Sequence, residues 1–297
     1  MIWTAPPDRA PDARQPLGLH RFTLNELLNW ILLIAGAAYW GGVIRTYHHD
    51  AAIGVVSVAQ SVFSDGAFNV AGCGLIAVWA RRIELRDIAS RWQIAGALAI
   101  SLLFAVPTRQ TTILGLLAVG AVLTFRSPIH TARPIAALLL GFAGEMIWTS
   151  TYLLPLHAAT ASFDAELCSG FLRMLGEAVQ VRANVLENLG AGINVEILAA
   201  CASSFPLAGV AMAFMVVMAY AHHVPRLADL PWLVAALLAS VALTELRLSL
   251  MALGDANYLW IHDGEGGTLY ALSATALAVL FPVLAMRQSG SVRAFAA

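Results

Sequence analysis

Long runs of apolar residues, separated by short polar stretches, recur along the whole chain. An apolar helix of about 20 residues crosses the hydrocarbon core of a bilayer. These runs also lack the alternation of apolar and polar residues that is typical of outer-membrane strands. The pattern therefore predicts an all-α fold, a polytopic bundle of transmembrane helices with about eight spans. The expected spans cover residues 25–44, 63–80, 93–107, 110–125, 134–155, 196–220, 231–252 and 267–286.

The composition agrees with a membrane protein and excludes an ordinary soluble domain. Of the 297 residues, 59% are hydrophobic and only 12% are charged, whereas soluble domains carry about 25% charged residues. The expected partner is therefore the lipid bilayer, and no nucleic-acid partner is expected. The net charge of −1 does not itself indicate a partner. All 17 basic residues are arginines, which excludes chemistry that needs a lysine, such as a Schiff base.

The distribution of arginines predicts the orientation of the spans. Cytoplasmic loops of membrane proteins carry an excess of basic residues, and a cytoplasmic N-terminus places twelve of the 17 arginines inside. The arginines that fall outside or near the outer face are Arg45, Arg109, Arg173, Arg182 and Arg247. We therefore expect eight spans with both chain ends in the cytoplasm.

This topology divides the chain into five parts. The parts are a cytoplasmic tail (1–24), an N-terminal region of five spans (25–155), an extracytoplasmic loop (156–190), a C-terminal core of three spans (191–286) and a second cytoplasmic tail (287–297). The charged residues of the loop fit either an amphipathic interfacial helix or a solvated face.

Three residues with reactive side chains converge on the outer face in this topology. Cys201 lies near the outer end of the sixth span, Arg247 lies towards the outer end of the seventh, and His262 lies in the short loop before the eighth. Pro206 follows Cys201 and predicts a helix that restarts there, with Ser203 or Ser204 as its N-cap. A cysteine beside a broken helix at the water interface is better placed to react than one in the middle of a span.

These residue types suit acyl transfer. A thiolate is the nucleophile, a nearby guanidinium favours the thiolate, and a histidine takes up the thiol proton and returns it to the leaving amine. An arginine also stabilises the oxyanion of a tetrahedral intermediate. We therefore predict Cys201, Arg247 and His262 as the catalytic residues, with no cofactor and no metal. The three cysteines are widely spaced and odd in number, so neither a disulfide framework nor a zinc site is expected.

Each residue also has an alternative interpretation without catalysis. Cys201 has small neighbours of the kind found where membrane helices pack closely. Arg247 fits an anchor whose guanidinium extends to the outer interface. His262, near Tyr258 and Trp260, fits an interfacial loop with an aromatic belt.

The ordered triple resembles the exosortase/archaeosortase family of membrane-embedded cysteine transpeptidases. The residues that carry the resemblance are Cys201 in "AACASS", Arg247 in "LTELRLSLMAL" and His262 in "IHDGEGG", at intervals of 46 and 15 residues. The resemblance covers about residues 175–285. The single motifs are short, and the ordered triple is more specific than any of them.

The chain departs from the family pattern in several places. Ala199 stands where family members often have an acidic residue, Ala202 follows the cysteine instead of serine, and Thr244 stands where an asparagine is common. A second cysteine, Cys168 in "ELCSG", matches the family motif better locally. The segment after Cys168 is too polar for a span and its distance to Arg247 is 79 residues, which favours Cys201 as the nucleophile.

The resemblance implies a function in protein sorting. Such enzymes cleave the C-terminal sorting signal of exported proteins, which consists of a short motif, a transmembrane stretch and a basic tail. The implied location is the bacterial inner membrane, with the active site facing the periplasm. The alternative is a non-catalytic transporter or scaffold with a polar path at Arg247 and Glu145. Glu145, in "GFAGEMIWTS", fits either a functional intramembrane acid or a carboxyl group hydrogen-bonded within the bundle.

Overall fold

The computed structural model of the chain describes residues 23–49, 67–81, 89–106, 108–126, 132–150, 153–221, 223, 225–262 and 264–288. Most of the N-terminal tail, the first residues of the second expected span and the chain from residue 289 onwards lie outside this set. Asp263, which follows the candidate His262, also lies outside it.

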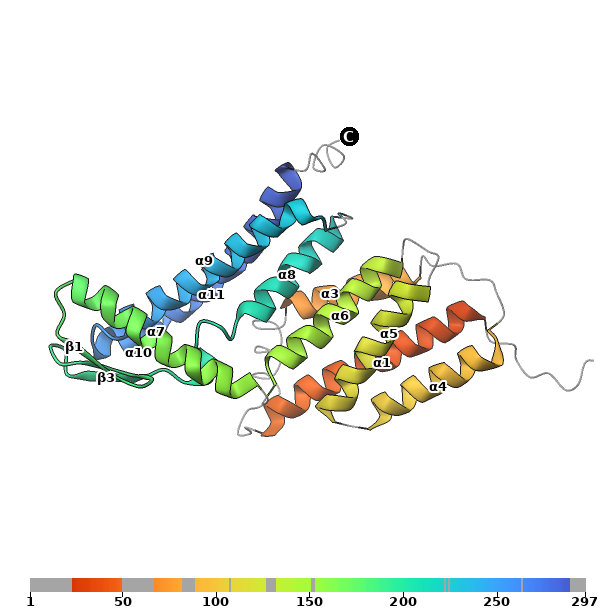
Figure 1. Ribbon diagram of the computed structural model, residues 1–297, viewed down its shortest axis with the longest axis horizontal. Helices are drawn as coiled ribbons and strands as arrows, with labels where there is room; N and C mark the ends of the chain where they lie inside the picture. The colour runs from red at the N-terminus through yellow and green to blue at the C-terminus, as the bar shows by residue number, and fades with distance from the viewer. Residues whose placement is uncertain are drawn as a thin grey trace, which may run out of the picture.

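The described part of the chain is mostly helical, which confirms the predicted helical class (Figure 1). The helices are α1 (Leu24–His49), α3 (Ala67–Ala80), α4 (Arg91–Ala105), α5 (Arg109–Arg126), α6 (Ala132–Trp148), α7 (Leu154–Met174), α8 (Leu207–Tyr220), α9 (Leu230–Met251), α10 (Asp255–His262) and α11 (Glu265–Gln288). Two short 3₁₀ helices are η2 (Ala199–Cys201) and η3 (Leu227–Asp229).

Local sequence signals set several helix starts. Ser90 caps α4, because its hydroxyl accepts from the amide of Gln93 while the Gln93 side chain accepts from the amide of Ser90. Pro206 precedes α8, as the predicted helix restart requires. The predicted capping of α8 by Ser203 or Ser204 is wrong, since the N-cap is Pro206 and no side chain caps it. Both serines instead bond to other elements.

A three-stranded sheet is the main departure from the all-α prediction. Strands β1 (Val179–Arg182), β2 (Val185–Asn188) and β3 (Ile193–Glu196) form an antiparallel meander in the order β1-β2-β3. Leu186 pairs with Val181 on one side and with Val195 on the other, so one face of the sheet is apolar. The strands are only four residues long, which is too short for the alternation of apolar and polar residues to distinguish them from a loop.

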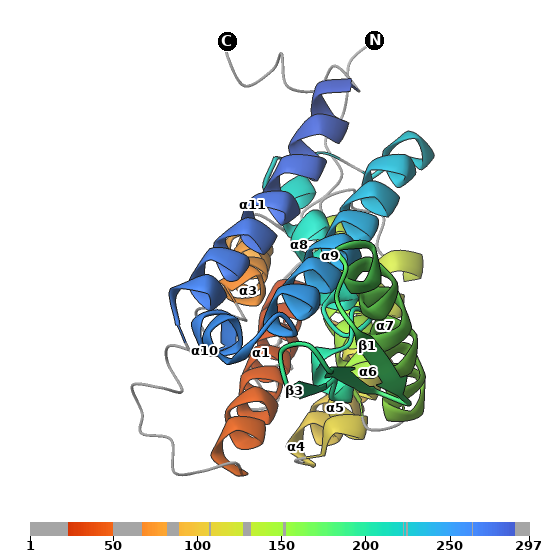
Figure 2. The ribbon, with the colours of Figure 1, turned by 90° about the vertical axis from the view of Figure 1, so that its left-hand side faces the viewer.

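The expected loop 156–190 is therefore an ordered cap and not a simple connection. It contains most of α7 and all of β1 and β2, and its buried side chains pack with those of β3 and of the C-terminal end of α9. Figure 2 views the molecule from the side on which α7, the sheet and α10 lie together. Asn188 ties this cap to α9, because its side-chain amide donates to the carbonyl oxygen of Ala252 at 2.9 Å.

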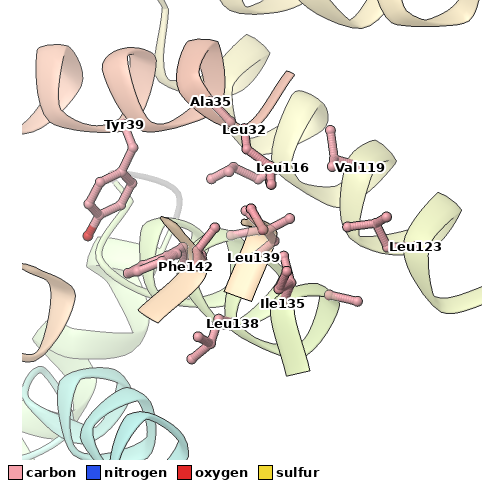
Figure 3. Packing of buried hydrophobic residues seen from close by; sticks show 14 of the residues in the cluster. Leu32, Ala35, Tyr39, Leu116, Val119, Leu123, Ile135, Leu138, Leu139 and Phe142 are labelled. Atoms are coloured by element: carbon pink, nitrogen blue, oxygen red, sulfur yellow. The ribbon is translucent and has the colours of Figure 1, made fainter. Parts of the chain in front are cut away.

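The N-terminal helices pack around a separate apolar core (Figure 3). Leu32 and Tyr39 of α1 meet Leu116 of α5, together with Ile135 and Phe142 of α6. Met212 and Val216 of α8 belong to the same core, so α8 joins the N-terminal bundle to the C-terminal helices. These contacts follow from helices that are apolar around most of their circumference.

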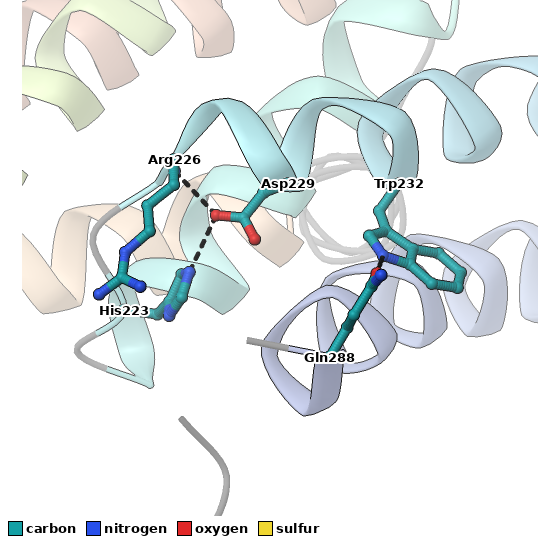
Figure 4. Close-up of polar contacts among 5 residues, drawn as sticks. All are labelled: His223, Arg226, Asp229, Trp232 and Gln288. Carbon is teal, nitrogen blue, oxygen red and sulfur yellow. Dashed lines mark hydrogen bonds and ion pairs between the residues drawn. The ribbon is translucent and has the colours of Figure 1, made fainter. Parts of the chain in front are cut away.

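Helices α8, α9 and α11 form the C-terminal group, and one end of it is fixed by polar contacts (Figure 4). Nε2 of His223 lies 2.9 Å from the Asp229 carboxylate, which also accepts from the Arg226 amide. Nε1 of Trp232 donates to Oε1 of Gln288 at 2.6 Å, so α9 begins where α11 ends. The other end of this helix pair therefore holds the end of α9 and the start of α11.

Two described helical segments, not about eight, have the length and composition of a membrane span. They are Leu227–Met251, which contains η3 and α9, and Glu265–Gln288, which is α11. Four other apolar helices are shorter, namely Phe68–Ala80, Arg91–Ala105, Arg109–Phe125 and Leu207–Tyr220. The sixth expected span, 196–220, shows the reason: residues 196–206 form the last residue of β3, η2 and turns, so α8 has only 14 residues. Such a helix is about 21 Å long, against a hydrocarbon core of about 30 Å.

Candidate active site

Cys201 lies in an irregular segment between β3 and α8. It is the last residue of η2, and its amide donates to the carbonyl oxygen of Leu198 at 2.8 Å. The backbone then becomes extended at Ala202, so the thiol lies outside any α-helix, five residues before Pro206, the N-cap of α8. The thiol is free of any disulfide and the residue is half-buried. This placement agrees with a helix that breaks beside the cysteine.

The surroundings of Cys201 bring it into the same cluster as α10. Cys201 and Tyr258 both pack against the apolar cluster formed by α7, the sheet and the end of α9. The ring of His262 stacks on Tyr258, with ring centroids 5.1 Å apart and an angle of 8° between the ring planes. His262 is exposed at the end of α10. The histidine therefore stacks on a tyrosine that borders the same apolar cluster as the cysteine.

Arg247 lies in α9 and faces α11. Its guanidinium carbon is 4.7 Å from the ring centroid of Tyr270, a cation–π geometry. The Tyr270 hydroxyl is 3.1 Å from the hydroxyl of Thr244, one turn back along α9, which holds the aromatic ring against this helix face. Nε of Arg247 is buried and has no hydrogen-bond partner among the described residues. The side chain thus retains donor capacity that the described protein groups do not use.

Glu245 and Arg247 point to different sides of α9, as their spacing of two residues predicts. Glu245 faces α7, where its carboxylate accepts from the Cys168 thiol at 3.1 Å. Arg247 faces α11 through Tyr270. Glu245 is therefore not the partner of the arginine.

The three predicted site residues lie at one end of the C-terminal helix group. Cys201 precedes α8, Arg247 lies in the last part of α9, and His262 ends α10 just before α11. Each comes from a different element. Cys201 borders the apolar cluster that contains Leu248 and Ala252 at the end of α9, and α10 follows that end of α9 in the chain. Tyr258 and Tyr270 lie beside the histidine and the arginine, and neither was predicted as a site residue.

A buried acid that the sequence analysis missed lies next to the cysteine segment. Asp164 on α7 is fully buried and accepts from both the amide and the hydroxyl of Ser203, at 2.7 Å each. Its carboxyl group also lies within interaction range of Glu245. The one signal in the sequence is the spacing of His157, Ala161, Asp164 and Cys168, which places an acid on the apolar face of an amphipathic helix.

A second contact of α7 holds the next residue of the segment. Nδ1 of His157 lies 2.9 Å from the hydroxyl of Ser204, and Nε2 lies 3.0 Å from the carbonyl oxygen of Trp148. Nε1 of Trp148 donates to the carbonyl oxygen of Ser204 at 2.9 Å. A carbonyl oxygen only accepts, so Nε2 of His157 carries a proton. The segment that follows Cys201 is therefore bonded at two successive residues to the buried face of α7.

Cys168, the second candidate nucleophile, has an unreactive environment. It is almost fully buried, and its thiol donates to the Glu245 carboxylate. Burial, together with the neighbouring Glu245, raises the pKa of the Cys168 thiol to about 12. A thiol with such a pKa is protonated at neutral pH and is a poor nucleophile. An apolar cavity of about 240 Å³ between α7 and α9 borders it, lined in part by Leu167, Phe171 and Leu246.

Glu145 belongs to a separate polar cluster in the N-terminal bundle. Its carboxyl group accepts from Nδ2 of Asn69 at 3.0 Å and from the Tyr39 hydroxyl at 3.3 Å. These contacts join α1, α3 and α6, as expected for a carboxyl group hydrogen-bonded within the bundle. Arg109 lies near the same cluster and donates to the carbonyl oxygen of Met146.

Within the described ranges, no group of three or more His, Cys, Asp and Glu side chains is placed to hold a metal ion. Neither a model of a protein family, nor a curated protein, nor a solved structure matches the chain. The arrangement of Cys201, Arg247 and His262 at one end of the helix group is thus the basis for assigning a function.

Proposed function

We propose that this chain is a membrane-embedded cysteine endopeptidase or transpeptidase that cleaves C-terminal sorting signals of exported proteins at the outer face of the inner membrane. The observation that carries the proposal is that Cys201 borders the apolar cluster at the C-terminal end of α9, the helix that carries Arg247, and that α10, which ends at His262, follows directly after α9. They are the nucleophile, the oxyanion-stabilising cation and the acid–base group that acyl transfer needs.

The exposure of the C-terminal helices supports a location in the membrane. In the two segments with the composition of a span, only 22% of the apolar window is buried within the protein. Leu238 of α9 and Leu272 of α11 are more than 60% exposed. The core helix of a soluble protein is mostly buried, whereas a helix in lipid keeps apolar side chains on its outer surface. We place these side chains against acyl chains.

In the proposed reaction, the thiolate of Cys201 attacks the carbonyl carbon of the scissile peptide bond. The carbon–sulfur bond forms, and the oxyanion of the tetrahedral intermediate lies against the guanidinium of Arg247. The carbon–nitrogen bond then breaks, and His262, which took up the thiol proton, protonates the leaving amine. Water or an acceptor nucleophile releases the thioester and restores the thiol.

A transporter or scaffold with a polar path from Arg247 to Glu145 is the alternative. Glu145 is bonded to Asn69 and Tyr39 in the N-terminal bundle, while Arg247 packs on Tyr270 between α9 and α11. Among the described residues the two groups thus belong to different clusters, and these contacts do not favour the path over acyl transfer.

The function is tested by co-expression with a candidate substrate. The substrate is an exported protein from the same genome that ends in a short motif, an apolar span and a basic tail. We expect a shortened product with a new C-terminus at the motif only when the chain is present, measured by immunoblot and mass spectrometry. An identical product pattern with and without the chain, across such substrates, rejects the proposal.

The orientation gives a separate prediction. Because cytoplasmic loops are rich in basic residues, reporter fusions after Gly254 are expected to report the periplasm, and fusions after Pro225 or Met286 the cytoplasm. The measurement is the activity of a paired alkaline phosphatase and green fluorescent reporter at each site. A cytoplasmic signal from the Gly254 fusion places His262 on the wrong face and removes the proposed site.

A further inference from the structure

The segment that carries Cys201 has little regular structure of its own. Residues 198–206 are held by turn hydrogen bonds, from Cys201 to Leu198 and from Phe205 to Ala202. Such a segment has many accessible conformations, and ordering a backbone residue costs about 1–2 kcal/mol. The position of the thiol therefore depends on contacts that the segment makes with its neighbours.

The strongest of these contacts come from Asp164. Its two carboxylate oxygens each accept one bond from Ser203, the second residue after Cys201, and both bonds are 2.7 Å long. A carboxylate that accepts an amide and a hydroxyl bond is a strong acceptor, and charge-assisted bonds of this length are about twice as strong as neutral ones. Asp164 is completely buried, so water does not compete for these bonds.

We infer that Asp164 is a positioning residue that holds the Cys201 thiol at the end of the helix group where Arg247 and His262 lie. This inference rests on the proposed function. Asp164 does not touch the reacting atoms; it acts through Ser203. His157 assists by holding Ser204 from the same face of α7, two helical turns earlier.

The positioning role of Asp164 explains why the cap packs against the end of α9 and the cysteine segment. Helix α7 packs against α9 and against η2, so one rigid element contacts both the cysteine segment and the helix that carries Arg247. A displacement of about 1 Å of a reacting group costs roughly 10²-fold in rate. The cap thus sets the spacing between a residue before α8 and a residue near the end of α9.

The test compares alkylation of Cys201 by two reagents in the purified full-length protein. Iodoacetate is an anion and iodoacetamide is neutral, so the ratio of their rates reports whether a cation lies beside the thiol. The Cys201 adduct is quantified by peptide mass spectrometry, so Cys73 and Cys168 stay in place. We expect Asp164→Asn and Ser203→Ala to lower the ratio roughly fivefold, the size of one unit-charge attraction at ~4 Å in water, and Arg247→Ala to lower it equally.

Two controls separate positioning from general stability. Ser203→Thr keeps the amide and the hydroxyl and is expected to keep the wild-type ratio. Ser169→Ala removes a buried hydroxyl on the same helix and is also expected to keep the wild-type ratio. Among the described residues this hydroxyl donates within α7, to the carbonyl oxygen of Glu166. An unchanged ratio in Asp164→Asn and Ser203→Ala, with only a lower melting temperature, overturns the inference. If Asp164→Asn does not accumulate, Ser203→Ala decides.

Processing of a substrate gives the second measurement. Asp164→Asn is expected to lower kcat roughly 10²-fold with little change in KM, because the substrate still binds while the thiol is misplaced. The alkylation ratio is measured without substrate, so the positioning role of Asp164 and the proposed function are tested independently. A ratio that falls as expected in a protein that processes nothing rejects the proposed function alone, and a normal kcat in Asp164→Asn rejects the positioning role alone.

Discussion

Cys201→Ala is expected to abolish processing of a sorting substrate while the protein still accumulates in the membrane. Removing the nucleophile of a well-studied soluble protease lowers kcat on the order of 10⁶-fold, so no product should be detected. Cys201 is half-buried in an irregular segment and packs only at the edge of its apolar cluster, so its loss should cost little stability. The measurement is the amount of processed substrate relative to the amount of enzyme in the membrane.

Cys168→Ala is the matched control. The Cys168 thiol is buried, donates to Glu245 and has a pKa raised to about 12, so it is not ionised at neutral pH. The variant is expected to retain most processing, with some loss of stability because a buried side chain is truncated. If Cys201→Ala processes the substrate at the wild-type rate, Cys201 is not the nucleophile. If only Cys168→Ala loses processing, Cys168 is the nucleophile.

Arg247→Lys is expected to lose most turnover although it keeps the positive charge. Lysine lacks the planar set of donors and cannot reproduce the stacking of a guanidinium on an aromatic ring, and Arg247 lies 4.7 Å above Tyr270 with a buried Nε that no described group bonds. Loss of one oxyanion donor lowers the rate roughly 10²–10³-fold in a soluble protease, and we expect a similar loss here. Substrate binding should suffer less, because the contact strengthens in the transition state.

The comparison of Arg247→Lys with Arg247→Ala separates catalysis from anchoring. If Arg247 only anchors α9 at the interface, Arg247→Lys is expected to leave the processing rate unchanged. The processing rate of both variants is therefore measured against their abundance in the membrane. Wild-type processing rates in both Arg247→Lys and Arg247→Ala would show that Arg247 has only a structural role at the outer interface.

The positions of the apolar helices were predictable because they depend on local pattern. Helices α9 and α11 begin and end within two residues of the predicted spans 231–252 and 267–286. A long apolar run has one low-energy backbone in lipid, a helix that bonds its own amides. The restart of the chain at Pro206 was predictable for the same local reason.

The sheet of the cap was not predictable from pattern, although an amphipathic helix in residues 156–190 was one of the two interpretations of that segment. Residues 156–190 contain most of α7 and two strands of four residues, and the strands have too few apolar positions to distinguish strand from loop. What orders them is burial of Leu172, Leu186 and Val195 against one another and against α9. Such contacts join residues far apart in the chain, so a local pattern does not report them.

The sequence by itself determined a mostly helical, strongly apolar chain and the order of Cys201, Arg247 and His262 along it, because composition and helix periodicity are properties of short segments. Only the tertiary structure decided which faces meet. It directs Glu245 towards Cys168 and Arg247 towards Tyr270, and it bonds Asp164 to Ser203. A side chain's partner depends on how separate helices pack, and a rotation of one helix by a single residue, about 100°, changes that partner while the apolar pattern stays the same.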